Sequence, residues 1–215
     1  MSTKEKILEA ALALFSKRGY TAVSVRDIAA KVGVRESAMY KHFSDKRAVF
    51  DRLVADYIAL SDDFMADINA LPTQDPESLK QTAEIYSKLT DEEFLKIGGR
   101  VFTAFLLRPD VIQFWRMISI ERFNDKKLAK LWHRLLFEEP IEFQTGMFGL
   151  LVNIGAVRPA EPTILALEFF APLLLLYLQA LPFEPGSKEF KRSLEFANLH
   201  MKHFRETYTI KSQEK

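Results

Sequence analysis

The sequence contains no cysteine among its 215 residues. Disulfide bonds and thiolate metal sites are therefore excluded, and the absence favours a reducing, intracellular compartment. The first ten residues, MSTKEKILEA, carry charges of both signs and lack the apolar run of a secretory signal. We therefore expect a cytoplasmic protein.

Motifs of the common enzyme classes are also missing. We find no phosphate-binding loop, no dinucleotide-binding glycine pattern, no nucleophile elbow and no HExxH motif. His200 and His203 are three residues apart, but no thiolate or matching acid completes a metal site with them. The sequence therefore predicts no catalytic residues, no cofactor and no bound metal.

Glycine and proline are scarce, with eight and nine residues, and they lie between runs of helical periodicity. No convincing alternating strand pattern is present. The sequence thus predicts an all-α fold of about nine to ten helices. We expect a three-helix head over residues 1–50. A fourth helix, about 45–70, would connect it to a larger helical bundle over 51–215.

Charge is unevenly distributed along the chain. Residues 1–50 contain ten Lys or Arg and five Asp or Glu, a net charge of +5, although the whole chain carries only +1. The remaining 165 residues therefore carry −4. A basic head on an acidic body indicates a polyanionic partner for the head alone.

Residues 24–43 have the spacing of a helix-turn-helix. Ser24 and Asp27 form an S-x-x-D capping box at the start of one helix, and Gly33 provides the turn that ends it. Ala29 is small, so a second helix can approach closely. Buried contacts between the two crossing helices would come from four apolar positions, Ile28, Val32, Val34 and Met39. The second helix of such a pair enters the DNA major groove.

The polar residues around this turn are candidate DNA contacts. Near the base edges we expect the start of the second helix, namely Arg35, Glu36, Ser37 and Ala38. Arg26 is placed to reach either a phosphate or a base. Near the phosphates we expect the residues that follow, namely Tyr40, Lys41, His42 and Lys46.

Residues 3–55 resemble the N-terminal domain of the TetR family of bacterial one-component repressors. The resemblance is carried by Ser24, Ile28-Ala29, Gly33-Val34, Tyr40, His42-Phe43 and Lys46. Arg35 and Ser37-Ala38 replace the usual Ser/Thr and Gly-Thr, so no operator sequence can be borrowed from the family. The resemblance implies a ligand-released homodimeric repressor that binds a pseudo-palindromic operator in double-stranded DNA. It also implies a C-terminal domain that binds a small molecule and pairs with a second subunit.

Two helices near the C-terminus support pairing independently. Residues 163–181 are apolar on nearly every side, so this helix is expected to be wholly buried. Glu168, Pro172 and Gln179 argue against a membrane span. The last helix has a heptad-like stripe and a second apolar face. A four-helix dimer interface would use Phe170, Leu174, Tyr177, Phe196, Leu199 and His203.

The middle of the chain is dense in aromatic residues, which suggests a cavity for a small apolar or aromatic effector. Candidate pocket residues are Arg100, Phe102, Phe105, Trp115, Glu121, Phe148 and Phe169. For any single aromatic residue among them, however, ordinary core packing is the better interpretation. The alternative to a regulator is a helical small-molecule carrier or enzyme with a purely structural N-terminal head.

Overall fold

The computed structural model describes residues 1–68, 81, 84–100 and 107–210, and side chains are described for most of these. Within these ranges the chain forms ten α-helices and no strand beyond an isolated bridge between Val157 and Thr209. The expected all-α fold is confirmed. The chain divides into two compact units, residues 1–64 with 108–132 and residues 65–107 with 133–215.

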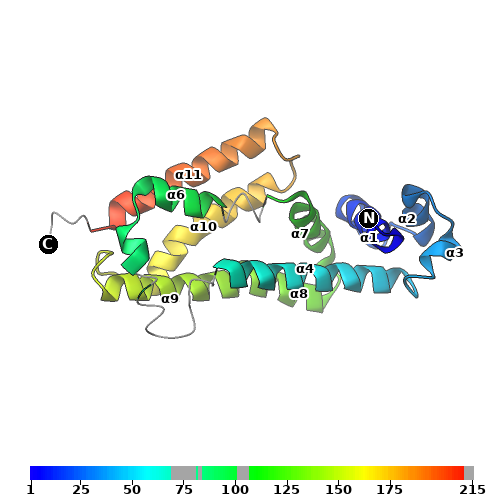
Figure 1. The fold of residues 1–215 in the computed structure, drawn as a ribbon, viewed down its shortest axis with the longest axis horizontal. Coiled ribbons are helices and arrows are strands. Elements are labelled where there is room, and N and C mark those ends of the chain that lie inside the picture. The colour runs from blue at the N-terminus through cyan, green and yellow to red at the C-terminus, as the bar shows by residue number, and fades with distance from the viewer. Residues whose placement is uncertain (69–80, 82–83, 101–106, 211–215) are drawn as a thin grey trace. The chain divides into compact units, whose positions relative to one another are not determined.

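The first unit contains the expected head and two further helices (Figure 1). The head consists of α1 (Thr3–Arg18), α2 (Val25–Val32), α3 (Glu36–Met39) and the first part of α4 (Lys46–Ile68). α7 (Pro109–Glu121) packs against α1 and is followed by α8 (Lys126–His133). The head core contains Phe15, Ile28 and Val49, all fully buried. The rings of Tyr57 on α4 and Phe114 on α7 stack with centroids 3.6 Å apart.

Local sequence signals account for the ends of the head helices. Gly19 follows α1 with a φ of 76°, and its N–H donates to the Phe15 carbonyl. At the start of α4, Asp45 accepts a hydrogen bond from the Ala48 N–H at 2.8 Å, and the Ser44 hydroxyl donates to Asp45. The aspartate directly precedes the helix, so its carboxylate reaches the free N–H groups of the first turn.

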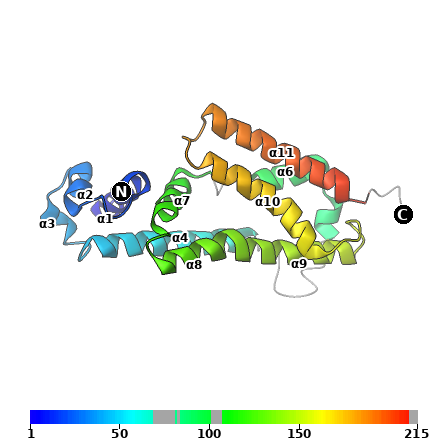
Figure 2. The same ribbon diagram turned by 180° about the vertical axis from the view of Figure 1, so that it is seen from behind.

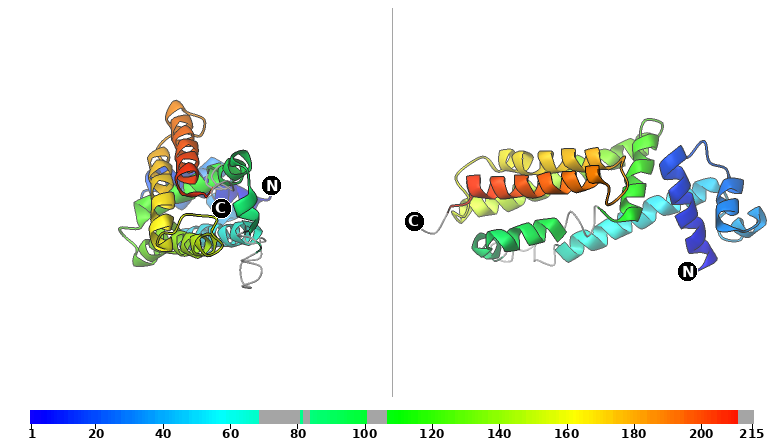
Figure 3. Two further views of the ribbon diagram at one scale, coloured as in Figure 1. Left: turned by 90° about the vertical axis from the view of Figure 1, so that its left-hand side faces the viewer. Right: turned by 90° about the horizontal axis from the view of Figure 1, so that it is seen from above.

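The second unit contains α6 (Asp91–Arg100), α9 (Glu139–Asn153), α10 (Pro162–Ala180) and α11 (Lys188–Tyr208). A π-helical turn, Arg134–Glu138, joins α8 to α9. α10 lies beside α9 and α11 (Figure 2), and Figure 3 shows α10 and α11 side by side again. The core between them includes Phe148, Leu165 and Phe204.

α10 is less buried in the single subunit than its composition predicts. We expected burial on every side, but Ile164, Leu167 and Leu175 are exposed. Within the described residues, packing against α9 and α11 therefore leaves part of the apolar surface of α10 open. By length and composition alone α10 would also be able to cross a membrane, which is weak evidence because core helices of soluble proteins have the same properties.

Candidate nucleic-acid interface

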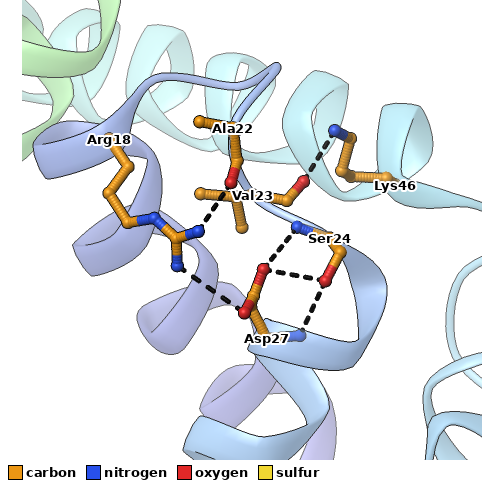
Figure 4. Close-up of polar contacts among 6 residues, drawn as sticks. All are labelled: Arg18, Ala22, Val23, Ser24, Asp27 and Lys46. Carbon is orange, nitrogen blue, oxygen red and sulfur yellow. Dashed lines mark hydrogen bonds and ion pairs between the residues drawn. The ribbon is translucent and has the colours of Figure 1, made fainter.

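The start of α2 is held by a closely connected polar cluster (Figure 4). The Asp27 carboxylate accepts hydrogen bonds from the N–H and hydroxyl of Ser24, and the Ser24 hydroxyl accepts from the Asp27 N–H. Arg18 donates to the Ala22 carbonyl at 2.7 Å and lies 3.6 Å from Asp27. The predicted capping box is thus present, and it fixes the helix that carries Arg26.

This cluster makes a pH-dependent contribution to stability. Hydrogen bonds from the Ser24 N–H and then from its hydroxyl lower the pKa of Asp27, and Arg18 lowers it further. A carboxyl with a depressed folded pKa stabilises the fold above its unfolded pKa, about 3.9. That contribution disappears as the pH falls through the lower, folded pKa.

We therefore expect Asp27→Asn to lower the free energy of unfolding near pH 7 and to have a smaller effect below about pH 4. Urea unfolding at a series of pH values between 7 and 3 measures the difference. Asp62→Asn, at an exposed position of α4, is the matched control for the loss of one carboxylate, and it should leave the free energy of unfolding nearly unchanged at pH 7. If Asp27→Asn lowered the free energy of unfolding by the same amount at every pH, this account would be contradicted.

The turn between α2 and α3 has the expected geometry. Gly33 adopts φ 79° and ψ 30°, the left-handed conformation that glycine accepts without strain. The Val34 N–H donates to the Ala29 carbonyl at 3.0 Å. Met39 and Phe43 are buried and anchor the far end of α3. These contacts leave the opposite face of α3 open to solvent.

The open face displays most of the predicted DNA contacts. Tyr40 is 54% exposed, which is unusual for a large ring, and Ala38 is half-buried. The remaining exposed members are Arg26, Arg35, Glu36, Ser37, Lys41 and His42. α3 itself is short, Glu36–Met39, because residues 40–42 form a turn. We call Arg26 and residues 35–42 the reading face.

Lys46 differs from the other expected phosphate contacts. Its half-buried ammonium group donates to the carbonyls of Tyr20 at 2.8 Å and Val23 at 2.7 Å. It also lies 4.1 Å from the centroid of the Tyr20 ring. Burial lowers the pKa of Lys46. This geometry favours a role in holding the α1–α2 connection, which leads directly into the capping box of α2.

We expect Lys46→Met to reduce stability by about 2 kcal/mol, since it removes two hydrogen bonds from a charged donor. Thermal and urea unfolding would measure the loss. Lys41→Met is the control, because Lys41 is exposed and its substitution should change stability by less than about 0.5 kcal/mol. Equal stability of the two variants would show that the Lys46 contacts contribute nothing measurable.

The Tyr20 peptide is held from α7 as well. Its N–H donates to Oε1 of Glu121 at 2.8 Å, and Glu121 is only 8% exposed. A Cβ at Gly19 would lie 3.1 Å from this same carboxylate oxygen, so glycine permits the close approach. Sequence reasoning missed this contact, because the two partners are 101 residues apart and no local pattern links them.

The residues predicted to line an effector pocket belong partly to the first unit and partly to the second. Trp115 and Glu121 are buried in the first unit, whereas Phe148 and Phe169 pack with Phe204 in the second. Phe102 and Phe105 lie outside the described residues, as does the side chain of Arg100.

Each unit contains a hollow among its described residues. A groove of about 1070 Å³ in the first unit is lined by α1, α4 and α7, including Leu12, Tyr57 and Phe114. A small cavity of about 50 Å³ in the second unit is lined by Phe94, Phe148 and Phe204. Phe148 is the only predicted pocket residue that lines either hollow in the described part of the chain.

The predicted dimer residues show graded exposure in the single subunit. Leu199 is 61% exposed, and Phe196 and His203 are also exposed. Phe170 and Leu174 are half-buried, whereas Tyr177 is only 2% exposed and lies inside the subunit. α10 and α11 carry five large apolar residues that are exposed in the single subunit, and we call them the open apolar face: Ile164, Leu167, Leu175, Phe196 and Leu199.

No metal site is apparent in the described ranges, where no group of three or more His, Asp or Glu is suitably placed. His200 has a structural contact instead, since its Nε2 donates to the Phe169 carbonyl at 2.9 Å. The two histidines of α11 therefore offer no pair free to bind a metal.

The architecture is that of a helix-turn-helix DNA-binding protein with a helical body. Residues 7–53 match the family described as "Bacterial regulatory proteins, tetR family". The tetracycline repressor protein class D of Escherichia coli is 31% identical over 211 residues, which cover 89% of this chain and 85% of that protein. The chain therefore belongs to the TetR family of bacterial transcriptional regulators.

A second curated relative matches only the head. IcaR of Staphylococcus aureus, the negative regulator of the biofilm operon icaADBC, is 35% identical over 51 residues. The match covers 24% of this chain and 27% of IcaR, about a quarter of each. This match supports the assignment of the head as a DNA-binding domain and gives no information on the function of the C-terminal body.

Solved structures share the fold over nearly the whole chain. A protein from Mesorhizobium loti described as a TetR-family transcriptional regulator superposes with a TM-score of 0.63, 20% identity and 97% coverage of each chain. A SmeT–triclosan complex superposes with a TM-score of 0.59 and 19% identity, covering 99% of this chain and 94% of that one. At such identities the likeness extends to the fold alone.

Proposed function

We propose that the protein is a homodimeric, cytoplasmic repressor that binds a pseudo-palindromic operator and releases it when a small molecule binds. The observation that carries the DNA-binding step is the reading face, which combines exposed cations from α2 and from both ends of α3, an exposed tyrosine after α3 and the buried anchor Met39. Repression is supported by two relatives whose names describe repression, one of them aligned over most of the chain.

The dimer is supported by the open apolar face of α10 and α11. Large exposed apolar patches on a soluble protein mark interaction surfaces. Two-fold pairing through this face would present two reading faces to one duplex, with half-sites about 34 Å apart. This matches the symmetry of a pseudo-palindromic operator.

Release by a small molecule is the step of the proposal that the fewest structural observations support. The SmeT structure contains triclosan, which shows that this fold can hold a small molecule. We expect an apolar or aromatic effector, bound without catalysis. It would release DNA only if it binds the DNA-free conformation more tightly than the DNA-bound one.

The direct test is affinity selection of the full-length protein on a random duplex library. We expect a pseudo-palindrome to be enriched, with an affinity that falls steeply as salt increases. Failure to enrich any sequence would refute operator binding. The carrier or enzyme interpretation would then explain the chain better.

A further inference from the structure

Most acidic residues of the head have a structural task. Glu5 accepts a hydrogen bond from the Ser2 N–H at 2.6 Å, Asp27 closes the capping box of α2, and Asp45 caps α4. Glu9 and Glu36 are different. Throughout the described head, no hydrogen bond or ion pair involves either of their carboxylates.

Glu36 is exposed at the first position of α3, within the reading face. Arg35 and Lys41 of the same reading face carry positive charge, as expected for a surface that approaches phosphates. An unpaired carboxylate in that place repels the DNA backbone. A DNA group that donates a hydrogen bond to this carboxylate would offset the repulsion.

We infer that Glu36 is a specificity-determining residue that accepts a hydrogen bond from the exocyclic amino group of a cytosine in each half-site. In the major groove, cytosine N4 presents such a donor and is the usual partner of acidic side chains. The N-terminal residues of a recognition helix are those that reach base edges. This inference rests on the proposed function, since it requires α3 to lie in the major groove.

A purely structural role for Glu36 makes a different prediction. An acid in the first turn of a helix interacts favourably with the helix dipole. That interaction does not depend on the DNA sequence. Loss of it would weaken binding to all sequences alike and would leave the preferred operator unchanged.

The experiment compares affinity selection for the full-length protein and for Glu36→Ala, Glu36→Gln and Glu9→Gln. Glu9→Gln removes the same charge from an exposed residue of α1 outside the reading face, so it reports the general electrostatic effect. We expect the unaltered protein and Glu9→Gln to require cytosine at one position per half-site, with about tenfold discrimination.

Glu36→Ala should lose the preference at that position and retain it elsewhere. Glu36→Gln should shift the preference towards adenine, because a glutamine amide can both donate to and accept from that base. Both variants should bind random DNA at least as tightly as the unaltered protein, as should Glu9→Gln, since each loses a negative charge.

Three outcomes would overturn the inference. Unchanged preferences in Glu36→Ala would refute it while leaving operator binding intact. A preference for adenine in the unaltered protein that disappears in Glu36→Ala would show that the carboxylate reads adenine N6. Failure of the unaltered protein to enrich any sequence would refute the proposed function and this inference together.

Discussion

Replacing Leu199 with glutamate is expected to dissociate the dimer and to abolish tight operator binding. Leu199 is the most exposed large apolar side chain of the open face on α10 and α11. In a two-fold dimer the substitution places a charge on both subunits, and an unpaired buried charge costs about 3 kcal/mol or more. We therefore expect the dimer dissociation constant to rise by at least about 100-fold.

Operator affinity should fall when the dimer dissociates. A monomer keeps one reading face, and loss of the second removes roughly 10²- to 10⁴-fold in apparent affinity. Sedimentation velocity would measure the oligomeric state, and a gel-shift titration would measure operator affinity. Circular dichroism would verify that the helices remain, since leucine and glutamate are both good helix formers.

The control is Leu199→Met, which keeps an apolar side chain of similar size at the same position. It should remain dimeric and bind the operator as the unaltered protein does. If Leu199→Glu is still dimeric at low micromolar concentration, the interface lies elsewhere. The open face of α10 and α11 would then need another explanation.

The helix-turn-helix could be predicted in detail because its determinants are local. The Ser24–Asp27 capping box spans four residues, and the left-handed turn at Gly33 depends on a single residue. Local hydrogen bonds and backbone preferences determine both features. The family could also be predicted from the sequence, because its signature lies within one continuous segment.

The contacts that depend on distant parts of the chain could not be predicted. Nothing near Lys46 in the sequence indicates that its ammonium group turns back to the Tyr20 and Val23 carbonyls. Glu121 appeared to be a pocket residue, yet its carboxylate accepts from the Tyr20 N–H. Both contacts depend on how helices pack, which periodicity alone does not determine.

Burial on α10 illustrates a related limit. An apolar helix predicts that every face is covered, but composition does not say which faces are covered within the subunit. Tyr177 faces the interior of the subunit, whereas Leu167 and Leu175 do not. Sequence reasoning could therefore name the two helices that carry exposed apolar residues, while the exposed face of each helix required the structure; the dimer itself stays a prediction.

The double substitution Arg26→Ala/Tyr40→Ala is expected to weaken operator binding by about 100-fold, since each lost DNA contact is worth about 1–3 kcal/mol. Both side chains are exposed on the reading face. Their removal should therefore leave the melting temperature nearly unchanged. Operator titrations at several salt concentrations would also show a shallower salt dependence if Arg26 contacts a phosphate.

The matched control is Phe123→Ala/Lys130→Ala. It also removes one exposed aromatic ring and one exposed cation from the first unit, but outside the helix-turn-helix. Its operator affinity should be close to that of the unaltered protein. Equal losses in the two double variants would indicate a general effect of charge. Undiminished affinity in Arg26→Ala/Tyr40→Ala would exclude these two side chains from the DNA contact. A specific loss with an unchanged melting temperature would place the duplex against α3.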